Sequence, residues 1–226
     1  MGTRFGHYTE LKPKSFVEFK GKSMIVRSIE TLLSCGINRI IIGTGYLSEA
    51  FETLKGIYPQ IETCFSPRYA ETNSMYTLYN MKECIGDDDF ILLESDLIYE
   101  KRAILSLLEC QQKDVLLMSP LTKFQDQYYV DYDEDHILKA CSVHKEDLNV
   151  KGEFVGIHKI SNEFYKQMCG DYGTICEVQP KLGYEYELIR MSRAILPLYV
   201  LKIDDLKWYE IDDENDLLYA ENNILL

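Results

Sequence analysis

The sequence predicts an α/β fold in which a mixed, mostly parallel sheet is flanked by helices, formed as a single domain over residues 1–226. Over the first 120 residues, short apolar runs alternate with segments of helical periodicity, which is typical of a parallel sheet covered on both faces. Beyond residue 120, short apolar runs follow one another directly, which predicts antiparallel strands. A chain of this length is long enough to bury a full α/β core.

The first 120 residues supply the elements of the predicted parallel layer. Residues 23–34 place apolar side chains at positions 24, 25, 29, 32 and 33, which is a helical spacing, and Gly36 follows as a cap. Residues 39–43 form a solidly apolar run, as expected of a strand buried on both faces. By the same criteria we expect further helices at 48–56, 75–84 and 101–111, and further strands at 62–65, 89–94 and 114–118.

The pattern of residues 121–226 predicts that this half continues the same sheet and forms a lid over the edge of the sheet. We expect strands at 128–132, 137–143, 154–160, 198–203 and 207–211. We expect helices at 162–169, 184–194 and 213–223, with a glycine-rich stretch between the first two.

Composition excludes several classes of function. The formal net charge of −13 argues against an extended basic face for nucleic acid and against docking on anionic lipid. Residues 1–27 are the exception, because six Lys or Arg residues accompany only two Glu residues there. No apolar run approaches the roughly 20 residues of a membrane span, and no signal-peptide pattern is present. We therefore expect a cytoplasmic protein without nucleic-acid or membrane partners.

Cysteine and histidine give no sign of a metal or nucleophile site. The seven cysteines are scattered, odd in number and without a C-x-x-C pair, which predicts reduced thiols. The four histidines show no metal-ligand spacing, so we expect no zinc site. No Ser-His pair that would activate a nucleophile is evident either.

The cationic start of the chain has the composition of a polyphosphate-binding loop. Small residues let backbone N–H groups approach a phosphate, and Arg4 and Lys14 supply positive charge. The alternative is a solvated chain terminus, as for many basic N-terminal stretches. The motifs further along the chain favour the first interpretation.

Several motifs in order resemble one family. Gly2-Thr3-Arg4 with Lys12-Pro13-Lys14 resembles the signature loop of nucleoside-triphosphate transferases. The stretches that resemble the cytidylyltransferase branch of that family are 43–46, 69–79, 94–96, 208–212 and 214–217. That branch activates phosphocholine, 2-aminoethylphosphonate and similar compounds with CTP. The resemblance implies a Rossmann-like, nucleotide-diphospho-sugar transferase-like fold, with a nucleotide-binding half at 1–120 and an acceptor-binding half at 121–226.

By this resemblance the catalytic residues are Arg4, Lys14, Asp96 and Asp212. Asp96 and Asp212 would hold Mg²⁺, the expected cofactor, while Lys14 would reach the α-phosphate and Arg4 the β- and γ-phosphates. The attacking acceptor oxygen is already anionic, so the reaction needs positioning and charge stabilisation rather than a base. The structural alternatives are a turn residue for Asp96, a helix cap for Asp212 and a solvated side chain for Lys14.

The resemblance also implies a set of nucleotide-binding residues: Gly2, Thr3, Tyr46, Asn73, Ser74 and Ser95. Of these, Tyr46, Asn73 and Ser74 would lie near cytosine and ribose. Asn73 fits equally well as the cap of the following helix, and residues 43–45 fit a plain tight turn.

Aromatic residues beside carboxylates predict a site for an ammonium group in the second half. The expected acceptor-binding residues are Tyr129, Glu153, Glu185, Tyr186 and Trp208. The acceptor would then carry an amine or quaternary ammonium beside its phosphorus group. The alternative is that these aromatic side chains cover a core, and that alternative is the stronger one for tyrosines on strands and helices.

Two other functions stay open at this point: a sugar-1-phosphate nucleotidylyltransferase and a non-catalytic nucleotide-binding paralogue. The family motif is usually preceded by a buried strand and an Ala-Ala-Gly turn, which the printed sequence does not contain. We therefore expect Met1 to be an internal methionine of a longer enzyme, and the chain as given to be impaired or poorly stable. A homodimer is also left open.

Overall fold

The computed structural model describes Phe5 and residues 12–122 and 127–226, and its contacts divide the chain into two compact units. Unit 1 comprises Met1–Ala70, Glu94–Leu105 and Lys207–Leu226, and unit 2 comprises Glu71–Leu93 and Ser106–Leu206. Within the described residues, every helix is too short or too polar to cross a membrane. The nucleotide-binding role predicted for residues 1–120 and the acceptor-binding role predicted for residues 121–226 stay predictions.

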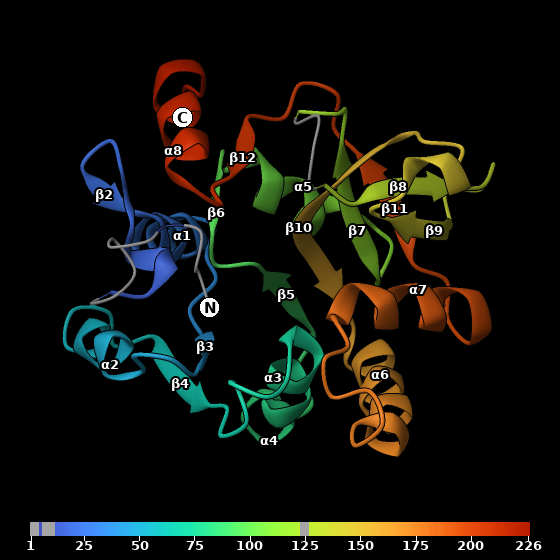
Figure 1. The fold of residues 1–226 in the computed structure, drawn as a ribbon, viewed down its shortest axis with the longest axis horizontal. Helices are drawn as coiled ribbons and strands as arrows, with labels where there is room; N and C mark the ends of the chain where they lie inside the picture. Colours follow the sequence, from blue (N-terminus) through green and yellow to red (C-terminus); the bar gives the residue numbers. More distant parts are fainter. Residues whose placement is uncertain (1–4, 6–11, 123–126) are drawn as a thin grey trace. The chain divides into compact units, whose positions relative to one another are not determined.

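Unit 1 contains three two-stranded sheets and the helices packed on them (Figure 1). The antiparallel hairpin of β1 (Glu18–Phe19) and β2 (Lys22–Ser23) turns through Lys20 and Gly21, both at positive φ. Strands β3 (Ile40–Thr44) and β4 (Ile61–Phe65) pair in parallel, and β6 (Leu97–Tyr99) pairs antiparallel with β12 (Trp208–Glu210). The remaining elements are the 3-10 turn η2 (Lys14–Phe16) and helices α1 (Met24–Ser34), α2 (Glu49–Lys55) and α8 (Glu214–Asn223).

One buried apolar cluster joins the N-terminal segment of unit 1 to its C-terminal segment. Its members are Phe5, Val17, Phe19, Met24, Ile98, Tyr209, Ile211 and Ala220. Five of these side chains come from β1, α1, β6, β12 and α8, elements that are far apart in the sequence, and the other three lie in the segments beside them or, for Phe5, near the N-terminus. Burying apolar surface from all five elements in one cluster fixes η2 and the start of β6 in the same small region.

Unit 2 is built on a six-stranded sheet in the order β11–β7–β10–β8–β9, with β5 also paired to β10. The strands are β5 (Phe90–Leu93), β7 (Val115–Ser119), β8 (Tyr129–Tyr132), β9 (Leu138–Ser142), β10 (Gly152–Ile160) and β11 (Tyr199–Lys202). Strand β11 runs parallel to β7, while the pairs that involve β8, β9 and β10 are antiparallel. The mixed α/β class is thus confirmed, and so is the antiparallel pairing predicted for the strands at 128–132, 137–143 and 154–160.

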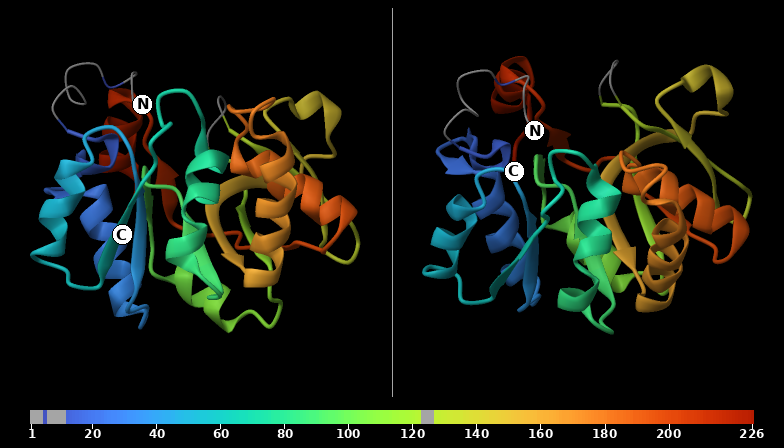
Figure 2. Two further views of the ribbon diagram at one scale, coloured as in Figure 1. Left: turned by 90° about the horizontal axis from the view of Figure 1, so that it is seen from below. Right: turned by 60° about the horizontal axis from the view of Figure 1, so that its bottom comes forward.

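Strand β10 curls strongly beside the helices of unit 2, as the dark gold ribbon in Figure 2 shows. Its pairing with β7 shifts register between Phe154 and His158, and Gly156 between them has φ 77°. A bulge of this kind bends a strand and increases its twist. His158 is fully buried there, and burial lowers its pKa to about 3, so its imidazole is neutral.

The helices of unit 2 are α3 (Ser74–Asn80), α4 (Lys82–Ile85), α6 (Asn162–Ile175) and α7 (Tyr184–Ala194), and α5 (Arg102–Glu109) crosses the boundary between the units. Helix α6 extends through the glycine-rich stretch that we predicted to be non-helical. Its buried face, with Tyr165, Met168 and Tyr172, outweighs the low helix propensity of Gly170 and Gly173. The helix predicted at 75–84 is broken at 81, and β6 was not predicted.

A buried acid lies between helices α6 and α7. Glu187 is fully buried, and the Nη1 atom of Arg190 lies 3.5 Å from its Oε2 atom. Arg190 makes its shorter contact, 2.6 Å, with Oδ2 of Asp171 on α6. Burial, followed by the neighbouring Asp171 carboxyl, raises the pKa of Glu187 to about 8. At neutral pH this carboxyl therefore holds a proton that it would lose on unfolding.

This raised pKa predicts a specific pH dependence of stability. Between the unfolded pKa near 4.5 and the folded pKa of about 8, the native state binds the extra proton, so rising pH lowers the free energy of unfolding. The slope from this group approaches about 1.4 kcal/mol per pH unit. Urea unfolding from pH 5 to 8.5 should show a smaller slope in Glu187→Gln than in the wild type. The exposed Glu109→Gln is the control, and equal slopes in all three proteins would contradict the assignment.

Candidate active site

The antiparallel pairing of β6 and β12 brings the two predicted aspartates together within unit 1. Glu210 pairs with Leu97, and the ladder extends one residue further because the Ile211 N–H donates to the Asp96 carbonyl oxygen at 3.0 Å. Asp96 comes immediately before β6, and Asp212 comes immediately after this last pair. In an antiparallel pair the start of one strand meets the end of the other, so backbone hydrogen bonds alone set the two residues side by side.

Lys14 lies between the two aspartates. Its Nζ donates to Asp96 Oδ2 at 2.7 Å and to Asp212 Oδ1 at 2.6 Å. The three side chains are between 16% and 21% exposed, so solvent screens the ion pairs only in part. Burial by itself would lower the pKa of Lys14, but the charges and hydrogen bonds of Asp96 and Asp212 outweigh it, and the pKa is raised. The ammonium therefore stays charged.

The short turn η2 holds Lys14 in this position. Pro13 begins the turn with φ −58°, and its carbonyl oxygen accepts from the Phe16 N–H at 2.9 Å. The ring of Phe16 contacts Phe51 of α2 edge to face, and the next residue, Val17, is buried in the core cluster. The turn that begins at Pro13, before Lys14, and the packing of Phe16 and Val17, after it, thus fix the direction of the Lys14 side chain.

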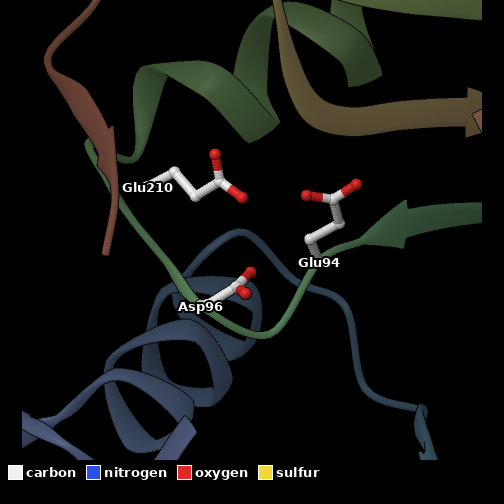
Figure 3. Close-up of side chains that lie close together, drawn as sticks. All are labelled: Glu94, Asp96 and Glu210. Carbon is white, nitrogen blue, oxygen red and sulfur yellow. The ribbon is translucent and has the colours of Figure 1, made fainter. Parts of the chain in front are cut away.

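Two further carboxylates lie beside Asp96. One oxygen from each of Glu94, Asp96 and Glu210 falls within 4.8 Å of the other two, and Figure 3 shows the three side chains converging. Hard carboxylate oxygens at such separations are the donors that Mg²⁺ prefers. The donor set therefore fits the expected cofactor, and it includes two residues that our sequence prediction did not name.

Spacing is the signal that could have identified Glu94 and Glu210. Each is two residues from a predicted aspartate, in Glu94-Ser95-Asp96 and Glu210-Ile211-Asp212. In extended chain, side chains two residues apart point to the same face. The site thus has four carboxyl groups, of which Asp96 and Asp212 contact Lys14 and Glu94, Asp96 and Glu210 lie close to one another.

The residues that follow Asp212 fix its backbone conformation through hydrogen bonds. Asp213 is the N-cap of α8, and its side chain accepts from the N–H groups of Asn215 and Asp216. The Asp212 N–H in turn donates to the Asp216 carboxylate at 2.9 Å. The capping role that we weighed for Asp212 therefore belongs to its neighbour, which leaves the Asp212 side chain directed to Lys14.

The glycine turn after β3 packs closely against the segment after β4. A Cβ atom on Gly45 would lie 2.6 Å from Cβ of Tyr69, which is closer than real contacts allow. The Ser66 N–H also donates to the Thr44 carbonyl oxygen at 2.8 Å. The neighbouring Tyr46 is 40% exposed, so the turn presents an aromatic side chain at the surface of unit 1.

Of the other predicted nucleotide-binding residues, Asn73 and Ser74 lie at the start of helix α3 in unit 2. Asn73 is the N-cap of α3, where its side chain accepts from the Ser74 N–H at 2.9 Å, as in the capping alternative. The Ser74 hydroxyl accepts from the Tyr184 N–H at 3.0 Å. Ser95 is exposed between Glu94 and Asp96. The predicted residues Gly2, Thr3 and Arg4 lie outside the residues that the structure describes.

Four of the five predicted acceptor-binding residues lie in unit 2, as two pairs. Tyr129 and Glu153 are partners across β8 and β10, and both are buried, with the Thr122 hydroxyl donating to Glu153. The other pair, Glu185 and Tyr186, begins helix α7. The fifth, Trp208, is buried in β12 of unit 1. Burial of Tyr129 and Trp208 agrees with the core-covering alternative for these two aromatic residues.

Tyr128 links the two pairs of unit 2. Its ring centroid lies 6.1 Å from that of Phe154 and 6.1 Å from that of Tyr186, which it meets edge to face. Burial and then the charge of Glu185 raise the pKa of Tyr128, and burial raises the pKa of Glu185. An aromatic face and a desolvated carboxyl are therefore neighbours at the start of α7, which is the composition of an ammonium site.

Comparison with known proteins identifies the family. The family model described as nucleotidyl transferase matches residues 1–123, which is more than half of the chain. This chain belongs to the nucleotidyl transferase family.

Relatives with similar sequences include cytidylyltransferases and a guanyltransferase. Choline-phosphate cytidylyltransferase of Streptococcus pneumoniae is 43% identical over 83 residues, which are 37% of this chain and 36% of that enzyme. CTP:phosphoglutamine cytidylyltransferase of Campylobacter jejuni is 24% identical over 96% of this chain and 94% of its own length. Mannose-1-phosphate guanyltransferase of Hypocrea jecorina is 33% identical over 43% of this chain and 28% of its own length.

A solved structure confirms the fold. The CTP:phosphocholine cytidylyltransferase of Streptococcus pneumoniae superimposes with a TM-score of 0.78 over 98% of this chain and 93% of that chain. Sequence identity in this superposition is 23%, so the match bears on the fold alone.

The contacts of Lys14 predict a stability cost when its charge is removed. Lys14→Met removes the ammonium that both Asp96 and Asp212 contact, so we expect the free energy of unfolding to fall by about 1–3 kcal/mol at low salt. Urea unfolding measures it. The exposed Lys12→Met is the matched control, and adding Asp96→Asn to Lys14→Met should recover part of the loss. A Lys14→Met protein as stable as the control would contradict the ion-pair account.

Proposed function

We propose that this protein transfers a cytidylyl group from CTP to a small phosphorylated or phosphonate acceptor and releases pyrophosphate. The observation that carries the proposal is the position of the Lys14 ammonium between Asp96 and Asp212, next to the carboxylate group of Glu94, Asp96 and Glu210. Cation and carboxylates in one place are what a triphosphate with its metal requires. The named activities of the cytidylyltransferase relatives support the choice of CTP.

The proposed reaction is an in-line displacement at the α-phosphorus of CTP. An anionic oxygen of the acceptor forms a new P–O bond to that phosphorus, and the bond between the α-phosphorus and the bridging oxygen to the β-phosphate breaks. Pyrophosphate leaves with the electron pair of that bond. No proton has to be removed from the nucleophile, so charge stabilisation and alignment are the work left to the protein.

In this proposal Lys14 neutralises charge that develops on the α-phosphate, where its fixed ammonium needs no reorganisation. Asp96 and Asp212 would hold Mg²⁺, with Glu94 and Glu210 as neighbouring oxygen donors. When bound, the ion supplies positive charge that offsets the repulsion between the triphosphate and an anionic acceptor. Arg4, Gly2 and Thr3 would bind the leaving phosphates.

The proposal gives the remaining predicted residues roles in binding. Tyr46, Ser95, Asn73 and Ser74 would lie near the nucleoside. In unit 2, the start of α7 would bind a cationic group of the acceptor through Glu185 and the adjacent rings. We keep Tyr129, Glu153, Tyr186 and Trp208 as acceptor-side predictions. A cytoplasmic location and a homodimer also stay predictions.

Nucleotide choice is tested by pyrophosphate release. Each of the four ribonucleoside triphosphates and dTTP would be offered with phosphocholine, 2-aminoethylphosphonate and glucose 1-phosphate in turn. We expect turnover with CTP to exceed that with any other nucleotide by at least about a hundredfold, because a site that hydrogen-bonds one base rejects others strongly. Preference for another nucleotide with glucose 1-phosphate would establish the sugar-phosphate alternative instead. Binding of CTP without turnover of any acceptor would contradict the proposed activity.

The assignment of the two aspartates is tested by isosteric substitution. Asp96→Asn and Asp212→Asn should each lower kcat by about a hundredfold or more, since several kcal/mol of charge stabilisation would be lost, and higher Mg²⁺ should recover part of it. Asp213→Asn is a matched control, because asparagine caps a helix as well as aspartate does. Equal rates in Asp96→Asn, Asp212→Asn and the control would refute the roles of Asp96 and Asp212.

A further inference from the structure

Hydrogen bonds join the starts of helices α3 and α7 within unit 2. The Tyr184 N–H, at the first residue of α7, donates to the Ser74 hydroxyl oxygen at 3.0 Å. The side-chain amide of Asn73 donates to the Lys181 carbonyl oxygen at 3.4 Å, and a third bond of 3.4 Å joins the backbones of the same two segments. The start of α3 thus holds the chain that leads into α7.

The Ser74 hydroxyl acts as the cap of helix α7. The first N–H groups of a helix have no partner within the helix, and the side chain of the residue before it usually supplies one. The residue before α7 is Gly183, which has no side chain for this purpose. A hydroxyl group from another helix therefore takes the place of the cap at the first residue of α7.

The side chain of Tyr184 fixes the other side of this junction. Tyr184 is 4% exposed, its hydroxyl lies 3.3 Å from Nε2 of His158, and its ring centroid lies 6.2 Å from that of Phe154. Both neighbours belong to β10 and lie at the two ends of its register shift. The first residue of α7 is therefore held by the sheet through its side chain and by α3 through its backbone.

Residues predicted to bind the two substrates lie on the two sides of the junction. Ser74 is predicted to lie near the nucleoside, and Glu185 and Tyr186, the second and third residues of α7, are predicted to bind the acceptor. A Cβ atom on Gly183 would overlap the Glu185 carboxyl, so this carboxyl folds back over the start of α7. A hydroxyl group that accepts a hydrogen bond can also donate one, so Ser74 can serve α7 and a nucleotide at once.

We propose that Ser74 couples the two substrate sites, so that bound nucleotide raises the affinity for the acceptor; this inference rests on the proposed function. A nucleotide that accepts from the Ser74 hydroxyl polarises it, which strengthens the bond that the same oxygen accepts from the Tyr184 N–H. The start of α7, with Glu185 and Tyr186, is then held in place before the acceptor arrives, so less conformational entropy is lost when it binds. For the acceptor, Ser74 is a positioning residue that acts through α7.

Calorimetry measures this coupling with a CTP analogue that has a methylene group in place of the oxygen between the α- and β-phosphorus atoms and cannot release pyrophosphate. Phosphocholine or 2-aminoethylphosphonate, whichever binds more tightly, is titrated into the protein and Mg²⁺ with and without saturating analogue. We expect the analogue to tighten acceptor binding about fivefold or more in the wild type and less than about twofold in Ser74→Ala. Ser74→Thr keeps the hydroxyl and should retain the coupling.

Ser192→Ala is the matched control. Ser192 lies in the last turn of α7, and its hydroxyl accepts from the Leu198 N–H at 3.3 Å, so the variant loses an equivalent bond at the other end of the same helix. It should show the coupling of the wild type, since it leaves the bond between Ser74 and Tyr184 intact.

Three results would overturn the inference alone: equal acceptor affinity with and without the analogue in the wild type, full coupling in Ser74→Ala, or loss of coupling in Ser192→Ala. Reciprocity gives a second check, because the acceptor must tighten binding of the analogue by the same factor. A wild-type protein that binds neither the analogue nor an acceptor would contradict the proposed function, and the inference with it.

Discussion

The arrangement of the candidate site depends on one constraint, the antiparallel ladder of β6 and β12. Its terminal hydrogen bond, from the Ile211 N–H to the Asp96 carbonyl oxygen, is what places Asp96 and Asp212 within reach of one ammonium. The ladder in turn is held by the core cluster, to which Ile98, Tyr209 and Ile211 belong. Core packing therefore fixes the backbone of β6 and β12, and that backbone fixes the positions of the charged side chains of Asp96 and Asp212.

Carboxylates at such short separations repel one another, and a cation between them reduces that repulsion. The Lys14 ammonium contacts the carboxylates of Asp96 and Asp212, and Asp96 in turn lies in a group with Glu94 and Glu210. Carboxylate oxygens this close together are suited to a divalent cation, which could bind there together with a triphosphate. The same arrangement explains why the proposed chemistry needs no general base, because the attacking oxygen is anionic from the start and the protein's task is to offset charge. Lys14 then acts as a resident counter-ion before substrate binds.

Sequence reasoning reached the fold class and most elements, because α1 and α7 have clear periodicity and β3 and β7 are solid apolar runs. It missed β6, since three residues directly after a turn give no periodic signal. Helix α6 extends beyond its predicted end at residue 169, because burial of one helix face outweighs the low helix propensity of two glycines. The residues Asp96 and Asp212 were named by resemblance, but nothing in local sequence encodes a pairing between segments so far apart. For Glu94 and Glu210 the available signal is their spacing of two residues from Asp96 and Asp212.

The central claim is that Lys14 occupies, as a cation, the place between carboxylates that otherwise attract a divalent ion. Calorimetric titration of Mg²⁺ into nucleotide-free wild type, Lys14→Met and Lys12→Met tests it most directly. The account predicts that Lys14→Met binds Mg²⁺ about tenfold more tightly than the other two proteins, because a competing positive charge has been removed. Equal or weaker binding in Lys14→Met would contradict it.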